Sequence, residues 1–275
     1  MVSVHSSSPG HVLSGGQWLD THFAACRPEY EALLGHVPFE AGANVLDAGC
    51  GTGAYLPLLE ATVGAAGSVV AADLARANVA VVPGGFARLT ADVGRLPFHD
   101  AAFDGVWSAN VSQYFDDEGL TALLAEFSRV VRPDGLLALK DVDMRAWDVQ
   151  PAPPFLGAHL AEACAATGRA QSTGSIRGRN LRRFLENAGF VDVEQHSLLI
   201  ERWAPLDAAA SRFWTDWLVY LAAVAEDSEL PREDRSFWQS VATPEQATAF
   251  VASPSFYGSE LQVVAFGRKP GGRHE

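Results

Sequence analysis

The sequence predicts an α/β fold in which a mostly parallel sheet is covered by helices on both faces. Short apolar runs alternate with segments of helical spacing between residues 43 and 142. Such alternation is typical of parallel strands joined through crossover helices. The apolar runs are continuous rather than alternating with polar residues, and this pattern is expected when both faces of a sheet are buried.

The predicted elements follow in a regular order. Strands are expected at 43–48, 68–72, 86–89, 103–108 and 136–142, with helices at 54–63 and 119–131 between them. Beyond this core we expect helices at 155–167, 180–188 and 207–227, and strands at 190–200 and 259–268. Pro28 interrupts the helical spacing near the N-terminus, so we expect two short helices there.

Composition and spacing divide the chain into one core with additions. The predicted segments are a flexible tail at 1–16, an N-terminal helical cover at 17–40, an α/β core at 41–143, a helical insertion at 144–178, a core helix and sixth strand at 179–204, a helical insertion or cover at 205–257, a last strand at 258–268 and a tail at 269–275. Long additions to a compact core usually carry function. We therefore expect them to cover a site.

Charge and cysteine content exclude several classes of function. The net charge of -13 disfavours nucleic acid and anionic membrane surfaces as partners. Cys26, Cys50 and Cys164 are scattered, so neither a disulfide framework nor a metal site is predicted. The N-terminus has no basic segment followed by an apolar one, and no apolar run approaches the ~20 residues that span a bilayer. We expect a cytoplasmic protein.

The stretch NVLDAGCGTG at 44–53 places an acid at the end of a buried strand and three glycines in the following turn. Asp73, Asp92 and Asn110 follow later strands, and strand ends of a parallel sheet converge on one crevice. Gly49, Gly51 and Ala54 formally match a dinucleotide-binding pattern. Asp47 disfavours a dinucleotide, because its charge would lie near the pyrophosphate. A ligand with a cationic amino-acid end suits this acid better.

Six segments in order resemble class I S-adenosylmethionine-dependent methyltransferases, and among them the small-molecule enzymes of the quinone-biosynthesis type. They are VLDAGCGTG (45–53), VVAADL (69–74), LTADVGRLPF (89–98), FDGVWSANVSQYF (103–115), RVVRPDGLLALKDVD (129–143) and FLENAGFVDVE (184–194). The resemblance implies a Rossmann-like sheet of seven strands, mostly parallel, with helical cover insertions. It also implies that the core at 41–143 binds S-adenosyl-L-methionine.

The resemblance assigns roles to residues at the strand ends. Asp47 would orient the amino group of the cofactor, Asp73 would accept the ribose hydroxyls, and Asp92 would accept the adenine amino group. The full set of expected cofactor-binding residues is Asp47, Ala48, Gly49, Cys50, Gly51, Asp73, Leu74, Ala91, Asp92, Val93, Asn110 and Val111.

The reacting end of the site is less defined by the sequence. His22 and Asp143 are the candidate catalytic residues, since methyl transfer sometimes needs a base. Asp141 lies beside Asp143, yet the fourth strand ends in Asn110 rather than an acid, so no metal is predicted. The candidate substrate-binding residues are Tyr30, Gln113, Tyr114 and Trp214. The aromatic stripe that contains Trp214 has helical spacing, which is also typical of a core.

These expectations combine into a methyltransferase that acts on a small or mid-sized organic acceptor, with oxygen first, then carbon or nitrogen, as the acceptor atom. Secondary metabolism is the expected setting. An enzyme of the same fold that uses the cofactor without transferring its methyl group, in a cyclisation or rearrangement, stays open as the alternative. The sequence is compatible with a monomer or a homodimer.

Overall fold

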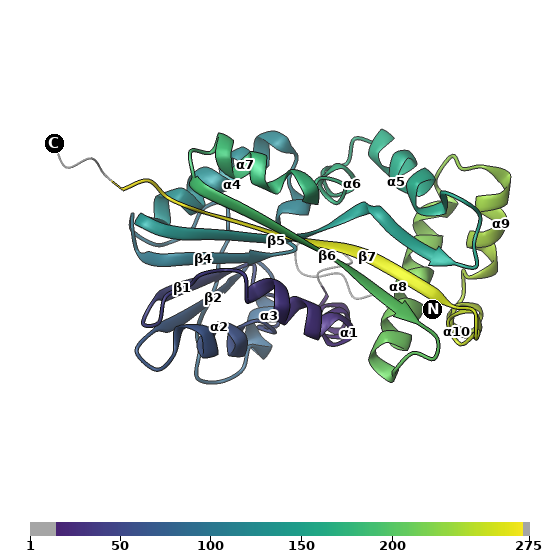
Figure 1. The fold of residues 1–275 in the computed structure, drawn as a ribbon, viewed down its shortest axis with the longest axis horizontal. Helices are drawn as coiled ribbons and strands as arrows, with labels where there is room; N and C mark the ends of the chain where they lie inside the picture. The colour runs from purple at the N-terminus through teal and green to yellow at the C-terminus, as the bar shows by residue number, and fades with distance from the viewer. Residues whose placement is uncertain (1–14, 272–275) are drawn as a thin grey trace.

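A computed structural model describes residues 15–271, so the tails predicted at 1–16 and 269–275 lie largely outside the described residues. Figure 1 shows one long, twisted sheet with helices on both faces and a group of helices at one end. The strands are β1 (Asn44–Ala48), β2 (Ser68–Asp73), β3 (Ala87–Thr90), β4 (Phe103–Ala109), β5 (Val131–Gln150), β6 (Val191–Trp203) and β7 (Tyr257–Arg268).

The seven strands lie in the order β3-β2-β1-β4-β5-β7-β6. Strands β1 to β5 pair in parallel, and β7 pairs antiparallel with both β5 and β6. This arrangement confirms the prediction of a seven-stranded, mostly parallel sheet. Val45 and Leu46 belong to two separate hydrophobic clusters, one on each face, which explains why the strands are continuous apolar runs.

Ten α-helices and two 3₁₀ turns cover the sheet in the described residues. They are α1 (Gly16–Leu34), α2 (Leu56–Val63), α3 (Arg76–Val81), η2 (Ser112–Tyr114), α4 (Asp117–Val130), α5 (Leu156–Ala166), α6 (Ala170–Gly174), η3 (Gly178–Asn180), α7 (Leu181–Asn187), α8 (Ala208–Glu226), α9 (Arg232–Ser240) and α10 (Pro244–Val251). Figure 1 shows α4 and α7 over one face and α1, α2 and α3 over the other.

Local sequence explains where the long helices begin. The side chain of Asp116 accepts a hydrogen bond from Gly119 N at 2.7 Å, which caps α4, and Asp207 caps α8 in the same way. Leu120, Leu123 and Phe127 place the buried face of α4 on the sheet. Helices α3, α9 and α10, which the sequence analysis did not predict, are short, and α9 is largely polar.

Helix α1 corrects the expectation of two short helices, because it continues through Pro28. A proline inside a helix removes one backbone hydrogen bond. Here Cys26 before the proline and Tyr30, Leu33 and Leu34 after it are all buried against the core. Packing on both sides of Pro28 therefore holds the helix together.

Strand β5 is longer than predicted, and this corrects the boundary placed at residue 143. The strand continues to Gln150, where it pairs with Tyr257 of β7, after a register shift between Asp143 and Asp148. Because β7 extends beyond the parallel core, it offers hydrogen bonds to a segment that the sequence analysis assigned to a helical insertion. Helices α5, α8 and α10 lie near the end of this extension.

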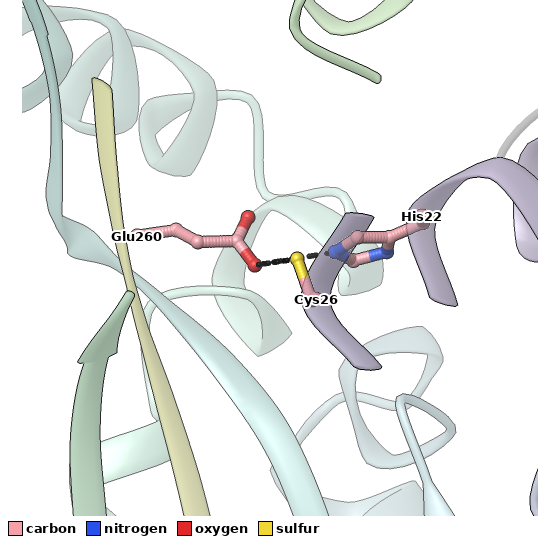
Figure 2. A group of neighbouring side chains, drawn as sticks. All are labelled: His22, Cys26 and Glu260. Atoms are coloured by element: carbon pink, nitrogen blue, oxygen red, sulfur yellow. Dashed lines mark hydrogen bonds and ion pairs between the residues drawn. The ribbon is translucent and has the colours of Figure 1, made fainter. Parts of the chain in front are cut away.

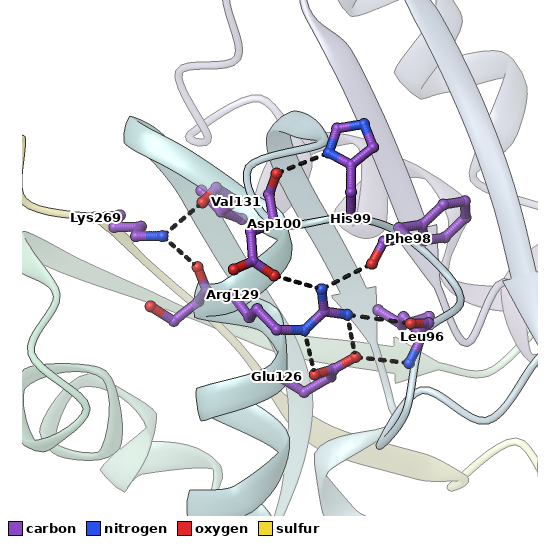
Figure 3. A network of polar contacts seen from close by, with 9 residues as sticks. Leu96, Phe98, His99, Asp100, Glu126, Arg129, Val131 and Lys269 are labelled. Carbon is purple, nitrogen blue, oxygen red and sulfur yellow. Dashed lines mark hydrogen bonds and ion pairs between the residues drawn. The ribbon is translucent and has the colours of Figure 1, made fainter.

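A hydrogen-bond network around Arg129 links helix α4 to the loop that precedes β4 (Figure 3). Its guanidinium donates to Glu126 and Asp100, and also to the carbonyl oxygens of Leu96 and Phe98 at 3.1 and 2.7 Å. The network ties the loop before β4 to α4 and so fixes the parallel half. Among the residues described, no helix combines the length and apolar character needed to cross a bilayer.

Candidate active site

A cavity of about 290 Å³ lies beyond the carboxyl ends of β1, β2 and β4, beneath α1, α6 and α8. Its floor is the glycine turn, and its walls come from segments far apart in the sequence. Residues predicted for the cofactor that line it are Asp47, Gly49, Cys50, Gly51, Asp73, Asn110 and Val111. Ligands of open α/β sheets sit in this position.

At Gly49 and Gly51, the glycine turn leaves no room for a side chain. Gly49 has φ +82°, and a Cβ there would lie 2.2 Å from Cγ2 of Val111. Gly51 has φ +55°, and a Cβ there would lie 2.7 Å from Cδ1 of Leu19 on α1. Both positions therefore need glycine, for backbone conformation and for space.

Asp47 is a buried acid with an unsatisfied oxygen. Its side chain is 1% exposed, and Oδ2 has no hydrogen-bond partner among the described residues. Burial, followed by the nearby charge of Asp73, raises the pKa of Asp47 to about 8. A buried carboxyl group without a partner is costly, so this position favours a ligand that brings a cation.

Asp73 joins the glycine turn to the end of β2. One oxygen accepts from Gly51 N at 2.9 Å and the other from Ala75 N at 2.7 Å. Burial raises the pKa of Asp73, while these backbone hydrogen bonds act in the opposite direction. The carboxylate is held rigidly at the cavity, with lone pairs left for a ligand.

The remaining predicted cofactor residues do not line the cavity. They are Ala48, Leu74, Ala91, Asp92 and Val93. The N–H of Ala91 donates to the carbonyl of Asp73 at 3.0 Å, which places the segment beside the end of β2. Asp92 itself is exposed and accepts from Gly94 N at 2.8 Å.

Helix α1 is fastened over the glycine turn. Thr52 Oγ1 donates to Asp20 Oδ1 at 2.6 Å, and Leu19 packs on Gly51. Trp18, Leu19 and His22 of this helix line the cavity. The helix predicted as a cover therefore contacts the predicted cofactor turn directly.

His22 lies in a buried polar cluster at the cavity wall. Its Nε2 is 2.8 Å from the hydroxyl of Tyr30 and 3.2 Å from Oε1 of Glu260. Figure 2 shows His22 and Cys26 on α1 facing Glu260 on β7. Burial would raise the pKa of Glu260, but the charge and hydrogen bond of His22, with further contributions from Gln262 and Lys140, hold it at about 2.

Lys140 continues this cluster towards the glycine turn. It is 1% exposed, its Nζ donates to Oδ1 of Asn110 at 2.9 Å, and it lies 3.6 Å from the centre of the Tyr30 ring. Burial lowers the pKa of Lys140 to about 8. Asn110 has φ +57°, so it combines an unusual backbone conformation with a place in the cavity wall.

Asp143 requires a correction, because its surroundings do not suit a general base. It does not line the cavity, and its carboxylate accepts hydrogen bonds from Arg145 and Arg179. Burial would raise the pKa of Asp143, but these hydrogen bonds hold it at about 2. The neighbouring Asp141 accepts from Ser112 Oγ at 2.6 Å and from Gln113 N at 3.0 Å. Both acids hold backbone segments in place.

Trp214 also requires a correction. Tyr30, Gln113 and Tyr114 line the cavity as predicted for substrate contacts, but Trp214 does not. Its ring packs on Gly258 of β7 and beside Phe256, at a centroid distance of 5.7 Å. Phe213 and Trp217 lie one helical turn apart on α8, and these two line the cavity.

Several lining residues were not predicted from the sequence. Examples from distant segments are Trp18, Met144, Arg169, Tyr220 and Glu260. Glu260 is the one with a sequence signal, since it is the only acid in the predicted strand SELQVVAFGR, half of which is apolar. Among the described residues that line the cavity, Arg169 is the only arginine or lysine.

Comparison with known proteins identifies the family. Residues 46–139 match the Methyltransferase domain family. Nocamycin O-methyltransferase of Saccharothrix syringae is 30% identical over 224 residues, which cover 73% of this chain and 79% of that protein. This chain belongs to the class I S-adenosylmethionine-dependent methyltransferases.

Other methyltransferases match a smaller part of the sequence. The malonyl-[acyl-carrier protein] O-methyltransferase of Serratia marcescens is 38% identical over 121 residues, or 43% of this chain. The aligned part spans 46% of that relative, about half of its length.

Solved structures agree on the fold. A Bacillus halodurans protein assigned as a methyltransferase has a TM-score of 0.57 at 18% identity, covering 88% of this chain and 99% of that chain. Phosphoethanolamine N-methyltransferase 2 of Haemonchus contortus, solved with S-adenosyl-L-methionine, has a TM-score of 0.54 at 14% identity, covering 94% of this chain and 58% of that chain.

Proposed function

We propose that this methyltransferase transfers the methyl group of S-adenosyl-L-methionine to an oxygen atom of a mid-sized organic acceptor in secondary metabolism. The observation that carries the proposal is the unsatisfied Oδ2 of Asp47, which lies beside the glycine turn in the same cavity as an aromatic wall. The cofactor has an amino group that satisfies this carboxylate. It supplies an electrophilic methyl group on a sulfonium.

The protein residues fit the two ends of this cofactor differently. Asp47 would hold the amino group, and the turn at Gly49 and Gly51 would allow close approach of the amino-acid part. Asp73 would accept from the ribose hydroxyls beside the backbone N–H groups that already donate to it. Asp92 and Leu74 would meet the adenine outside the cavity, where both are exposed.

The acceptor would lie against the wall formed by α1 and α8. Trp18, Phe213 and Trp217 give this wall a large apolar area, so it suits an acceptor with an extended apolar body. Oxygen is supported as the acceptor atom by the names of the nocamycin and malonyl-[acyl-carrier protein] enzymes, which are O-methyltransferases.

His22 is the proposed base. It lines the cavity, and the carboxylate of Glu260 lies 3.2 Å from its Nε2. A hydroxyl group becomes nucleophilic when a base removes its proton. The imidazole of His22 would accept that proton, and the charge of Glu260 would stabilise the imidazolium that forms.

Titration calorimetry with S-adenosylmethionine and with its demethylated product tests the cofactor site. Asp73→Ala should bind about ten- to hundredfold more weakly, because a carboxylate contributes ~1.5–3 kcal/mol through charged hydrogen bonds. Asp104→Asn is a matched control, since this acid also accepts a backbone N–H but lies at the opposite end of the sheet. Absence of binding by the wild type would refute the proposal.

A second reading, in which the cofactor is bound without methyl transfer, predicts a different product. Methylation adds a methyl group to the acceptor mass, whereas a cyclisation or rearrangement leaves it unchanged. Mass spectrometry of reactions with hydroxyl- and carboxyl-bearing organic acceptors, using cofactor labelled in its methyl group, separates the two. Loss of label from the cofactor without label in the product would contradict both.

A further inference from the structure

We propose that His22, Cys26 and Glu260 form a binding site for a thiophilic divalent cation of the Zn²⁺ class, with an open coordination position towards the cavity. The three side chains offer one nitrogen, one sulfur and one oxygen, which lie within 4.8 Å of one another. The site goes beyond the proposed methyl transfer and does not depend on it.

The positions of the ligands follow from two elements of the fold. His22 and Cys26 are separated by four residues on α1, so they lie on the same side of the helix. Glu260 reaches them from β7, 238 residues away from His22 in the chain. Figure 2 shows the three polar ends meeting between α1 and β7.

Two of the three distances between ligand atoms are close to those of tetrahedral zinc. Ordinary Zn–N, Zn–O and Zn–S bond lengths at tetrahedral angles place the nitrogen about 3.4 Å and the sulfur about 3.6 Å from the oxygen. The structure has 3.2 Å between His22 Nε2 and Glu260 Oε1, and 3.5 Å between Cys26 Sγ and the same oxygen. Side-chain rotation that sets His22 Nε2 and Cys26 Sγ, now within 4.8 Å of each other, at tetrahedral separation would give three ligand positions.

Without a cation, several groups of the cluster share one carboxylate oxygen. Oε1 of Glu260 is shared by His22, Cys26 and Gln262, of which only Gln262 approaches as closely as 2.8 Å. The thiol of Cys26 is a weak donor and is 2% exposed. A cation would replace the long thiol contact by a metal–sulfur bond, with release of the thiol proton.

Charge balance is compatible with a divalent cation. The carboxylate of Glu260 and a thiolate at Cys26 would neutralise its two charges. Lys140, the nearby buried cation, would keep the carboxylate of Asp141 as its counter-charge. Burial, followed by the charge of Glu260, raises the pKa of the Cys26 thiol, so the thiolate would form only when a cation is bound.

The fourth coordination position would face the cavity. His22 and Glu260 line the cavity, whereas Cys26 lies behind them. Three protein ligands with one open position are the arrangement of catalytic rather than structural zinc sites. A cation on Nε2 would occupy the lone pair that accepts a proton, so the loaded site would remove His22 from base catalysis.

The first test uses the metal ions alone on the full chain after chelator treatment. Zn²⁺ is titrated in competition with a chromophoric chelator, and Co²⁺ is added separately as a spectroscopic probe. We expect one saturable site, proton release on cation binding, and a thiolate-to-cobalt charge-transfer band that excess Mg²⁺ does not remove, because Mg²⁺ prefers oxygen ligands. Absence of saturable binding would overturn the proposal.

Variants then assign the site to its ligands. Cys26→Ser should abolish the charge-transfer band and weaken Zn²⁺ binding by about hundredfold or more, since even outer-shell changes cost about 10–100-fold. Glu260→Gln should weaken binding but keep the band. Cys164→Ser is the matched control, because this second partly buried cysteine lines the cavity away from the cluster, and it should bind like the wild type.

The opposite pattern would exclude the site. If Cys26→Ser keeps the band and the affinity, or if Cys164→Ser loses them, the cation binds elsewhere and the proposal is wrong. Circular dichroism of each variant and calorimetry with S-adenosylmethionine report folding and cofactor binding independently of the metal. Loss of metal binding in a variant that still binds the cofactor would support the assignment.

Discussion

The two halves of the cavity are built in different ways. The half proposed for the cofactor is formed by the ends of β1, β2 and β4, which are neighbours in the sheet, and its glycines and acids lie within or just after those strands. The half proposed for the acceptor combines α1, α6 and α8 with β7, and one of its polar contacts joins His22 to Glu260, 238 positions away. Local backbone geometry fixes the first half, and tertiary packing assembles the second.

This difference separates what binds the common cofactor from what selects the acceptor. Gly49 and Asp47 are constrained by the strand–turn geometry itself, so few replacements are compatible with it. Phe213 and Trp217 are constrained only by their neighbours on other helices. The helical cover can therefore change its lining residues while the cofactor turn stays the same.

The largest effect is expected from two tryptophans of α8 that have different neighbours. Trp214→Ala should destabilise the protein by about 3–5 kcal/mol, because the ring is 1% exposed and packs on β7. Trp217→Ala should cost less stability and should mainly weaken acceptor binding, since that ring faces the cavity. Chemical denaturation of both variants measures the first effect. Equal destabilisation with unchanged acceptor binding would contradict the different roles given to the two rings.

A smaller effect is expected from the pH dependence of cofactor binding. Asp47 has a pKa of about 8 in the unliganded protein, so it is protonated at neutral pH. Because the cofactor's amino group favours the carboxylate, affinity should rise by up to about tenfold per pH unit between about pH 5 and 8. Calorimetry in buffers of different ionisation enthalpy should also detect proton release. Asp47→Asn should remove the slope, and an unchanged slope would refute this role.

The smallest effect is expected from Asp143, the acid that lies outside the cavity. Its pKa is lowered to about 2, so its contribution to stability is present above the ordinary aspartate range and is lost as the pH falls towards 2. The contribution should be only about 1–2 kcal/mol, because Arg145 and Arg179 are 41% and 44% exposed and are screened by solvent. Thermal unfolding of Asp143→Asn between neutral and acid pH measures it. If this variant instead loses cofactor binding while unfolding normally, the acid belongs to the site after all.

The sequence alone was sufficient to predict the parallel core and the turn that contains Asp47 and Gly49. Continuous apolar runs and glycines act locally, so their meaning can be recognised from neighbouring residues. Trp214 shows the limit, because its helical stripe does not tell which of two adjacent aromatic residues faces a cavity. Glu260 shows another limit. A charged residue in a buried strand indicates that it has a partner, but the sequence does not identify that partner as His22. Strand β5 exceeded its predicted length because its partner, β7, lies more than a hundred residues away.

The position of β7 has a consequence for how the protein is made. This strand is the last element of the described chain, yet it lies between β5 and β6 and carries Glu260. During synthesis, β5 and β6 emerge before β7, the strand that lies between them. The edges of β5 and β6 that pair with β7 therefore stay unpaired until β7 is made. Neither the sheet nor the wall around His22 is complete until nearly the whole described chain has left the ribosome. A prematurely terminated product would retain the glycine turn but lack the wall opposite it, and it would expose two strand edges that favour aggregation.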